Sequence, residues 1–172
     1  MLDPIPVPAF LRDLAQPLAD VLHLSTLPLH IHEVLASFAT YTFIYSVLSP
    51  GLSSYLFSST YATFPARTQL QWNMHVTSLV NSLFLSSAAL YVLLCDKDML
   101  NSTWEERIWG YTGAGAMVQG MAAGYFVWDV QVCLTNIEML GVLDLLHAVV
   151  ALAISVLGFV RLVMFFPGMK LT

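Results

Sequence analysis

Charged residues fall into short groups along the chain and leave long uncharged segments between them. None occurs between Glu33 and Arg67, or between Arg67 and Asp96. A helix that crosses the hydrocarbon of a bilayer needs about 20 predominantly apolar residues. The pattern therefore predicts four spanning helices, which we place at about residues 34–56, 73–94, 108–128 and 145–166.

Turn residues interrupt the first of these segments. Ser49-Pro50-Gly51 should bend or end its helix, because proline lacks a backbone donor and glycine favours a turn. Residues 58–66, rich in Ser, Thr and Tyr, should then form a loop before the second span.

The first thirty residues carry charges that keep them out of the hydrocarbon. Their apolar positions nevertheless recur at helical spacing: Phe10, Leu14, Leu18, Val21 and Leu22. This spacing predicts a short helix lying in the membrane interface, kinked or split at Pro17, with an irregular proline-rich arm as the alternative. We therefore expect an N-terminal arm over residues 1–30 and a transmembrane domain over residues 31–172.

Composition supports a membrane setting. The 172 residues are 58% hydrophobic and 10% charged, with a mean hydropathy of +0.73, whereas soluble domains are about 45–50% apolar and about 25% charged. The fold class that we expect is an all-α, polytopic transmembrane bundle of about four spanning helices with an N-terminal interfacial segment.

The distribution of charge bears on partners and orientation. A net charge of −5 with only six basic residues argues against nucleic acid as a partner. A cytosolic N-terminus leaves only Arg67 on the outer side and satisfies the positive-inside rule. The basic residues then on the cytosolic side are Arg12, Lys97, Arg107, Arg161 and Lys170. The same orientation predicts that the sequon at Asn101 is not glycosylated.

Polar side chains at membrane depth are costly and mark candidate sites. On the second span one helical face carries four of them: His75, Ser78, Ser82 and Ser86. They form either the polar wall of a lipid pocket or hydrogen bonds between helices, and Asn81 lies off this face.

Two acids and a histidine are the other candidates for chemistry. Asp144 and His147 are three residues apart at a helix start, so the acid can cap the helix or orient the imidazole as a general base. Asp129 ends the third span beside an aromatic belt. If the protein is an enzyme, the catalytic candidates are His147, Asp144, Asp129 and His75.

Small residues on the third span indicate close helix packing. Ala116, Gly120 and Gly124 fall four residues apart and let another backbone approach, which makes a homo- or hetero-oligomer through this helix a hypothesis.

Metal and cofactor binding are not expected from the pattern. His30 and His32 point apart on a helix, and the two cysteines, Cys95 and Cys133, are isolated in the sequence. We therefore expect no metal site and no cofactor.

Several motifs resemble one known family in their order and spacing. They are Arg67-Thr68, Trp72-Asn73-Met74-His75-Val76-Thr77-Ser78-Leu79, Ala89-Leu90-Tyr91, Gly110-Tyr111-Thr112-Gly113, Gly124-Tyr125-Phe126-Val127-Trp128-Asp129 and Asp144-Leu145-Leu146-His147. The chain resembles the TLC domain shared by TRAM, the Lag1-type ceramide synthases and CLN8 proteins. Its start, with Leu2-Asp3-Pro4 and His30-Ile31-His32-Glu33, is similar to the fungal non-synthase branch.

Two departures from the family pattern shape the functional expectation. Ceramide synthases carry adjacent paired histidines for acyl transfer, whereas Ala148 follows His147 here. TLC domains also continue through further helices, so the chain, which ends at Thr172, is expected to be a C-terminally shortened form.

The resemblance implies an integral membrane protein of the endoplasmic reticulum, acting in lipid homeostasis, including that of sphingolipids, by binding or sensing a membrane lipid rather than by catalysis. The alternatives are an acyl-CoA-dependent acyltransferase of the ceramide synthase type and a packing subunit of a larger membrane complex. Membrane lipids are the expected partners.

Overall fold

The computed structural model describes residue 3 and residues 5–104 and 110–160, and this part of the chain is helical without strands. Arg107, Arg161, Lys170 and the ends of two expected spans lie outside the described residues. The helices are, in chain order, α1 (Ala9–Leu22), α2 (Leu27–Phe43), the π-helix η1 (Ile44–Leu48), α3 (Ser49–Leu56), α4 (Ser58–Tyr61), α5 (Ala66–Cys95), α6 (Lys97–Leu100), α8 (Gly113–Thr135), α9 (Ile137–Leu140) and α10 (Val142–Leu157).

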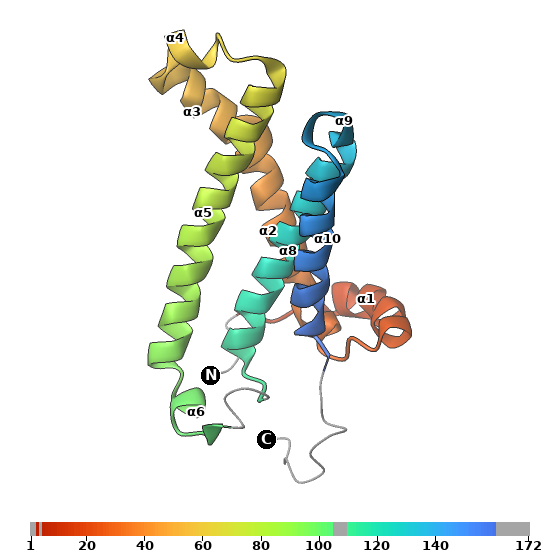
Figure 1. The fold of residues 1–172 in the computed structure, drawn as a ribbon. Coiled ribbons are helices and arrows are strands. Elements are labelled where there is room, and N and C mark those ends of the chain that lie inside the picture. The colour runs from red at the N-terminus through yellow and green to blue at the C-terminus, as the bar shows by residue number, and fades with distance from the viewer. Residues whose placement is uncertain (1–2, 4, 105–109, 161–172) are drawn as a thin grey trace.

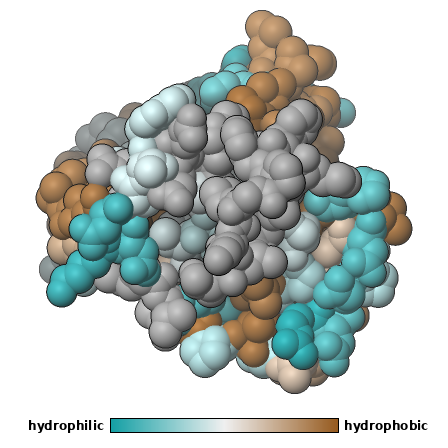
Figure 2. Space-filling model, turned by 90° about the horizontal axis from the view of Figure 1, so that it is seen from below, coloured by the Kyte–Doolittle hydropathy of each residue, from teal (hydrophilic) through white to brown (hydrophobic). Residues whose placement is uncertain are grey.

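Four long helical rods alternate in direction along the molecule (Figure 1). The first is the continuous helix formed by α2, η1 and α3, and α5, α8 and α10 follow it. Helices α1 and α6 lie at one end of the molecule, and α4 and α9 lie at the other. Seen from the end that carries α1 and α6, hydrophilic and hydrophobic groups of residues lie beside one another around the outside of the molecule (Figure 2).

Two of these rods are long and apolar enough to cross a membrane, fewer than the four spans expected. Among the described residues they are the 30-residue helices Leu27–Leu56 and Ala66–Cys95. Only 22% and 11% of the most apolar stretch of each helix is buried within the chain. Their apolar faces therefore have to be covered by something other than water or this chain, as lipid would do. Helix α8 falls short because glycines, glutamines and Asp129 dilute its hydropathy, and α10 is described over only 16 residues.

The expected break at Ser49-Pro50-Gly51 takes a milder form. The helix continues to Leu56, and the residues directly before the proline form the π-helical turn η1, in which the N–H of Ser49 bonds the carbonyl of Ile44. A proline cannot donate to the preceding turn, and a local π-turn accommodates that defect without ending the helix. The expected loop over residues 58–66 also contains the short helix α4.

Helix α1 continues through Pro17, so the helix is not split there, as one of the two expectations had it. Its two buried residues, Ala15 and Ala19, lie on one side of the helix. The predicted apolar face points away from the protein, with Phe10 and Leu14 exposed by 69% and 75%. This arrangement is typical of a helix that lies in a membrane interface.

Helices α2 and α8 form the tightest pair in the bundle. A Cβ on Gly124 would collide with the carbonyl oxygen of Val34 and lie 2.7 Å from the Cβ of Ser37. The hydroxyl of Ser37 donates to the carbonyl of Met121 at 2.6 Å. The expected small-residue contact therefore exists within the chain, at Gly120 and Gly124, while Ala116 is only half-buried.

Candidate functional site

The junction of α5 and α8 carries a polar contact inside an apolar bundle. The hydroxyl of Ser78 on α5 donates to the carbonyl of Met74 at 2.8 Å and lies 2.9 Å from the hydroxyl of Tyr125 on α8. Tyr125 belongs to an aromatic cluster with Tyr41 and Trp128, whose ring centroids lie 5.2 and 5.5 Å from its own. The aromatic cluster fixes the position of the tyrosine hydroxyl at the rim of the junction.

A buried polar row runs along the same side of α5. Asn73 accepts from Ser49 at 2.8 Å and donates to Tyr61 at 2.9 Å, and Thr77 bonds its own helix backbone. Asn81 is 7% exposed, and its buried side-chain carbonyl oxygen has no hydrogen-bond partner among the described residues. An unpaired polar atom in such a setting costs on the order of 1–3 kcal/mol.

The structure distributes the predicted polar face differently. Ser78 is half-buried at the junction, while His75, Ser82 and Ser86 are exposed. On the helical wheel Ser78 lies between the buried Asn81 and the exposed Ser82. Asn81, which was predicted to lie off the polar face of His75 and the serines, is therefore next to the junction. Its spacing of four residues from Thr77 is what indicates the buried polar row in the sequence.

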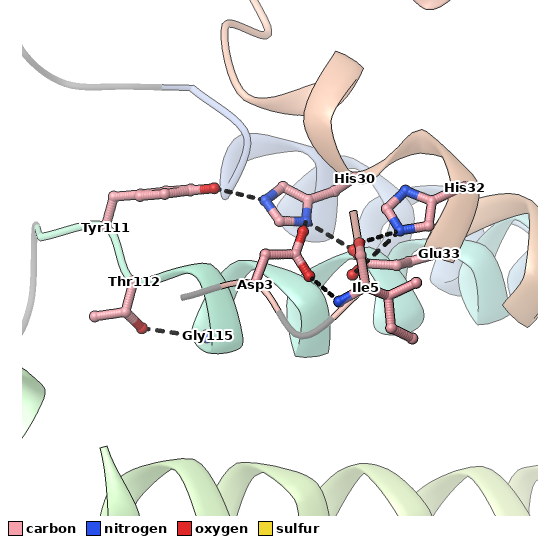
Figure 3. A network of polar contacts seen from close by, with 8 residues as sticks. All are labelled: Asp3, Ile5, His30, His32, Glu33, Tyr111, Thr112 and Gly115. Carbon is pink, nitrogen blue, oxygen red and sulfur yellow. Dashed lines mark hydrogen bonds and ion pairs between the residues drawn. The ribbon is translucent and has the colours of Figure 1, made fainter. Parts of the chain in front are cut away.

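A second polar group lies at the start of α2 and was missed in the sequence (Figure 3). The imidazole Nδ1 of His30 lies 2.7 Å from the carboxylate Oε2 of Glu33, and its Nε2 lies 2.7 Å from the hydroxyl of Tyr111. Asp3 reaches the same Nδ1 at 3.6 Å. The sequence does contain a signal for this group, because residues three apart on a helix, such as His30 and Glu33, lie side by side. Pairing His30 with His32 alone does not reveal it.

Three of the four predicted catalytic candidates lie on two neighbouring helices. Asp129 on α8 interacts electrostatically with His147 and with Asp144 on α10. Asp129 is half-buried, whereas His147 and Asp144 are both exposed. His75 on α5 is exposed as well and has no described contact with this group.

The TLC domain family matches residues 71–169, which include most of α5 and all of α8 and α10, and thus both the junction and the group around Asp129. The chain belongs to the TLC domain family. This membership confirms the resemblance seen in the sequence. The family is membrane-associated and linked to lipid metabolism, which agrees with the exposed apolar faces of the two long helices.

Two relatives extend the similarity to the N-terminal half. A TLC domain-containing protein of Schizosaccharomyces pombe is 30% identical over 159 residues, which are 92% of this chain and 52% of the relative. Topoisomerase I damage affected protein 4 of Saccharomyces cerevisiae is 27% identical over 131 residues, 75% of this chain and 44% of the relative. The chain thus spans about half the length of these curated relatives, and no solved structure matches it.

Proposed function

We propose that this TLC protein is an integral protein of the endoplasmic reticulum membrane that binds a membrane lipid at the α5–α8 junction and acts in lipid homeostasis without catalysis. In this proposal α8 and α10 cross the bilayer as well, because α8 packs against the two longer rods, α10 packs against α8, and the direction alternates from one to the next (Figure 1). Sphingolipids are the first class to test, since they offer hydroxyl and amide donors at the base of their chains.

The observation that carries this proposal is the carbonyl oxygen of Asn81, near the middle of α5, which has no hydrogen-bond partner among the described residues. A polar atom at membrane depth needs a partner, because lipid tails supply none. Around α5 the exposed Ser82, the half-buried Ser78 and the buried Asn81 follow one another from the outer surface inward, and we take this order as the path of a lipid headgroup. A lipid hydroxyl or amide N–H that follows this path gives Asn81 its missing donor, while the exposed apolar residues of α5 pack against the lipid chains.

The test is the lipid content of the purified full chain. We expect about one molecule of a single lipid class per protein after purification in mild detergent, and a content about tenfold lower in Asn81→Leu, which has nearly the same shape but no acceptor. Ser87→Ala is the matched control, because Ser87 is exposed on the same helix and only bonds the carbonyl of Leu83. Equal lipid in the wild type and Asn81→Leu, or none in either, refutes the proposal.

One observation favours a second candidate, an acyl-CoA-dependent acyltransferase. Asp129 is electrostatically coupled to Asp144 and His147, a combination that offers a base and acids to orient it. Membranes that contain the chain should then N-acylate a sphingoid base, and His147→Ala should abolish this activity. Activity no higher than in empty membranes removes this candidate.

A further inference from the structure

The group at the start of α2 contains two carboxylates and an imidazole that converge on one point (Figure 3). The closest ligand atoms of Asp3, His30 and Glu33 all lie within 4.8 Å of one another. Around an ion bound at about 2.1 Å, tetrahedral ligand atoms lie about 3.4 Å apart. The 3.6 Å between Asp3 and His30 fits this spacing, and the 2.7 Å between His30 and Glu33 has to lengthen by about 0.7 Å when an ion displaces their hydrogen bond.

Burial makes two negative charges at this point costly. The side chains of His30 and Glu33 are 0% and 1% exposed, and that of Asp3 is 22% exposed. Within the described part of the chain, no lysine or arginine forms an ion pair with either carboxylate. Buried carboxylates are normally paired with cations or bound to metals.

The carboxylate of Glu33 retains unused binding capacity. Its Oε1 is buried and accepts no hydrogen bond from the described residues, and the ring Nε2 of His32 lies 3.8 Å from it. A Cβ on Gly120 would lie 2.9 Å from Oε2 of Glu33, so the absence of a side chain there makes room for the carboxylate.

The surroundings hold the other two side chains in place. Tyr111 is the partner of the far nitrogen of His30, an arrangement that leaves Nδ1 free to bind a metal when Nε2 carries the proton. The backbone N–H of Ile5 donates to Asp3 Oδ1 at 2.9 Å, and the carbonyl of Ile5 lies 2.8 Å from Nε2 of His32. These contacts leave Oδ2 of Asp3 directed at His30.

We propose that Asp3, His30 and Glu33 bind one divalent transition-metal ion, with zinc the best match to one nitrogen and two carboxylate ligands. The ion neutralises the buried carboxylates and fastens the N-terminal arm to the start of α2. Three protein ligands leave a further position for water. The inference is independent of the lipid site, which lies on other helices.

The test uses the full chain in detergent, stripped with a chelator and titrated with Zn²⁺, and with Co²⁺ for its absorption spectrum. We expect one bound ion per chain. Bound Co²⁺ should give a visible absorption band of the kind that low-symmetry coordination produces. Affinity should fall at least tenfold in both Glu33→Gln and Asp3→Asn, and tenfold to a hundredfold in Tyr111→Phe. His75→Asn, an exposed histidine on α5, is the matched control and should bind as the wild type does.

Two results overturn the proposal. One is the absence of stoichiometric Zn²⁺ in the wild-type chain, which leaves a hydrogen-bonded Tyr111–His30–Glu33 chain with a proton in place of the ion. The other is equal affinity in the wild type and Asp3→Asn. Asp3 lies in the arm outside the helices, so this variant keeps the test valid even if Glu33→Gln fails to fold. Asn81→Leu should bind Zn²⁺ as the wild type does. A failure of the metal proposal can therefore be told apart from a failure of the lipid proposal.

Discussion

Gly124 is where α8 comes closest to α2, and a single methyl group there has no room. The added Cβ would collide with the carbonyl of Val34 and contact Ser37 and Phe38. Backbone atoms on a helix cannot rotate away as a flexible side chain can, so the two helices have to separate.

We therefore expect Gly124→Ala to destabilise the bundle by about 1–3 kcal/mol, the range of overpacking in a well-packed core. The matched control is Gly51→Ala, because a Cβ on Gly51 meets nothing within 4 Å. That control should be neutral or stabilising by about 0.5–1 kcal/mol, since alanine favours the helix. Thermal unfolding in detergent measures both, and equal midpoints for the two variants would disprove the close contact.

Single residues also show what the sequence could and could not predict about the site. The small-residue spacing of Gly120 and Gly124 correctly indicated close helix packing, because it depends only on helical periodicity. The contacts of His30 could not be predicted in full, because Tyr111 is 81 residues away from it and only the fold brings the two together. His75, Ser82 and Ser86 are exposed because the packed side of α5 is rotated toward Asn73 and Thr77.

At the scale of elements, α1 presents an apolar face away from the protein and carries its polar residues on the opposite side. Leu14 and Gln16 are both exposed but lie on opposite sides of the helix. If α1 lies in the membrane interface, only the first of these positions contacts acyl chains.

Spin labels at Leu14→Cys and Gln16→Cys test this placement in chain reconstituted in bilayers, with Cys95 and Cys133 replaced by serine. We expect the label at residue 14 to be more accessible to oxygen and the label at residue 16 to be more accessible to a water-soluble nickel complex. The same accessibility at both positions would place α1 in water and contradict the interfacial assignment.

Helices end where the sequence predicts when a charged residue or a turn is exposed to water. They extend past the predicted end when the protein itself pairs the charge or accommodates the turn. The first rod begins at Leu27 rather than at residue 34, because Glu33 is held inside the protein by His30 and not by water. It passes Pro50 because η1 absorbs the defect. Charge spacing alone cannot detect either compensation.

At the scale of the whole molecule, the alternating helices place the two connecting regions of α5 at opposite ends (Figure 1). Thr63 lies before this helix and Asn101 after it, and both are exposed. A 30-residue helix is about 45 Å long, enough to cross a bilayer with its interfaces.

We expect cysteines at these two positions to lie on opposite sides of the membrane. In intact microsomes carrying Cys95→Ser, a membrane-impermeant maleimide should label Asn101→Cys from the cytosolic side and reach Thr63→Cys only after the membrane is opened. Labelling of both positions before opening would show that α5 does not cross the bilayer. The reverse pattern would retain the crossing and invert the proposed orientation.

The most direct test of lipid binding at the α5–α8 junction is photo-crosslinking with a sphingolipid that carries a diazirine at the base of its acyl chain. The account predicts crosslinks concentrated on α5 around Ser78–Ser82 and on α8 around Tyr125, and their loss when unlabelled lipid of the same class is added. Crosslinks spread evenly over the exposed apolar faces, and unaffected by competition, would show only the general contact of a membrane protein with its bilayer and would contradict a specific site.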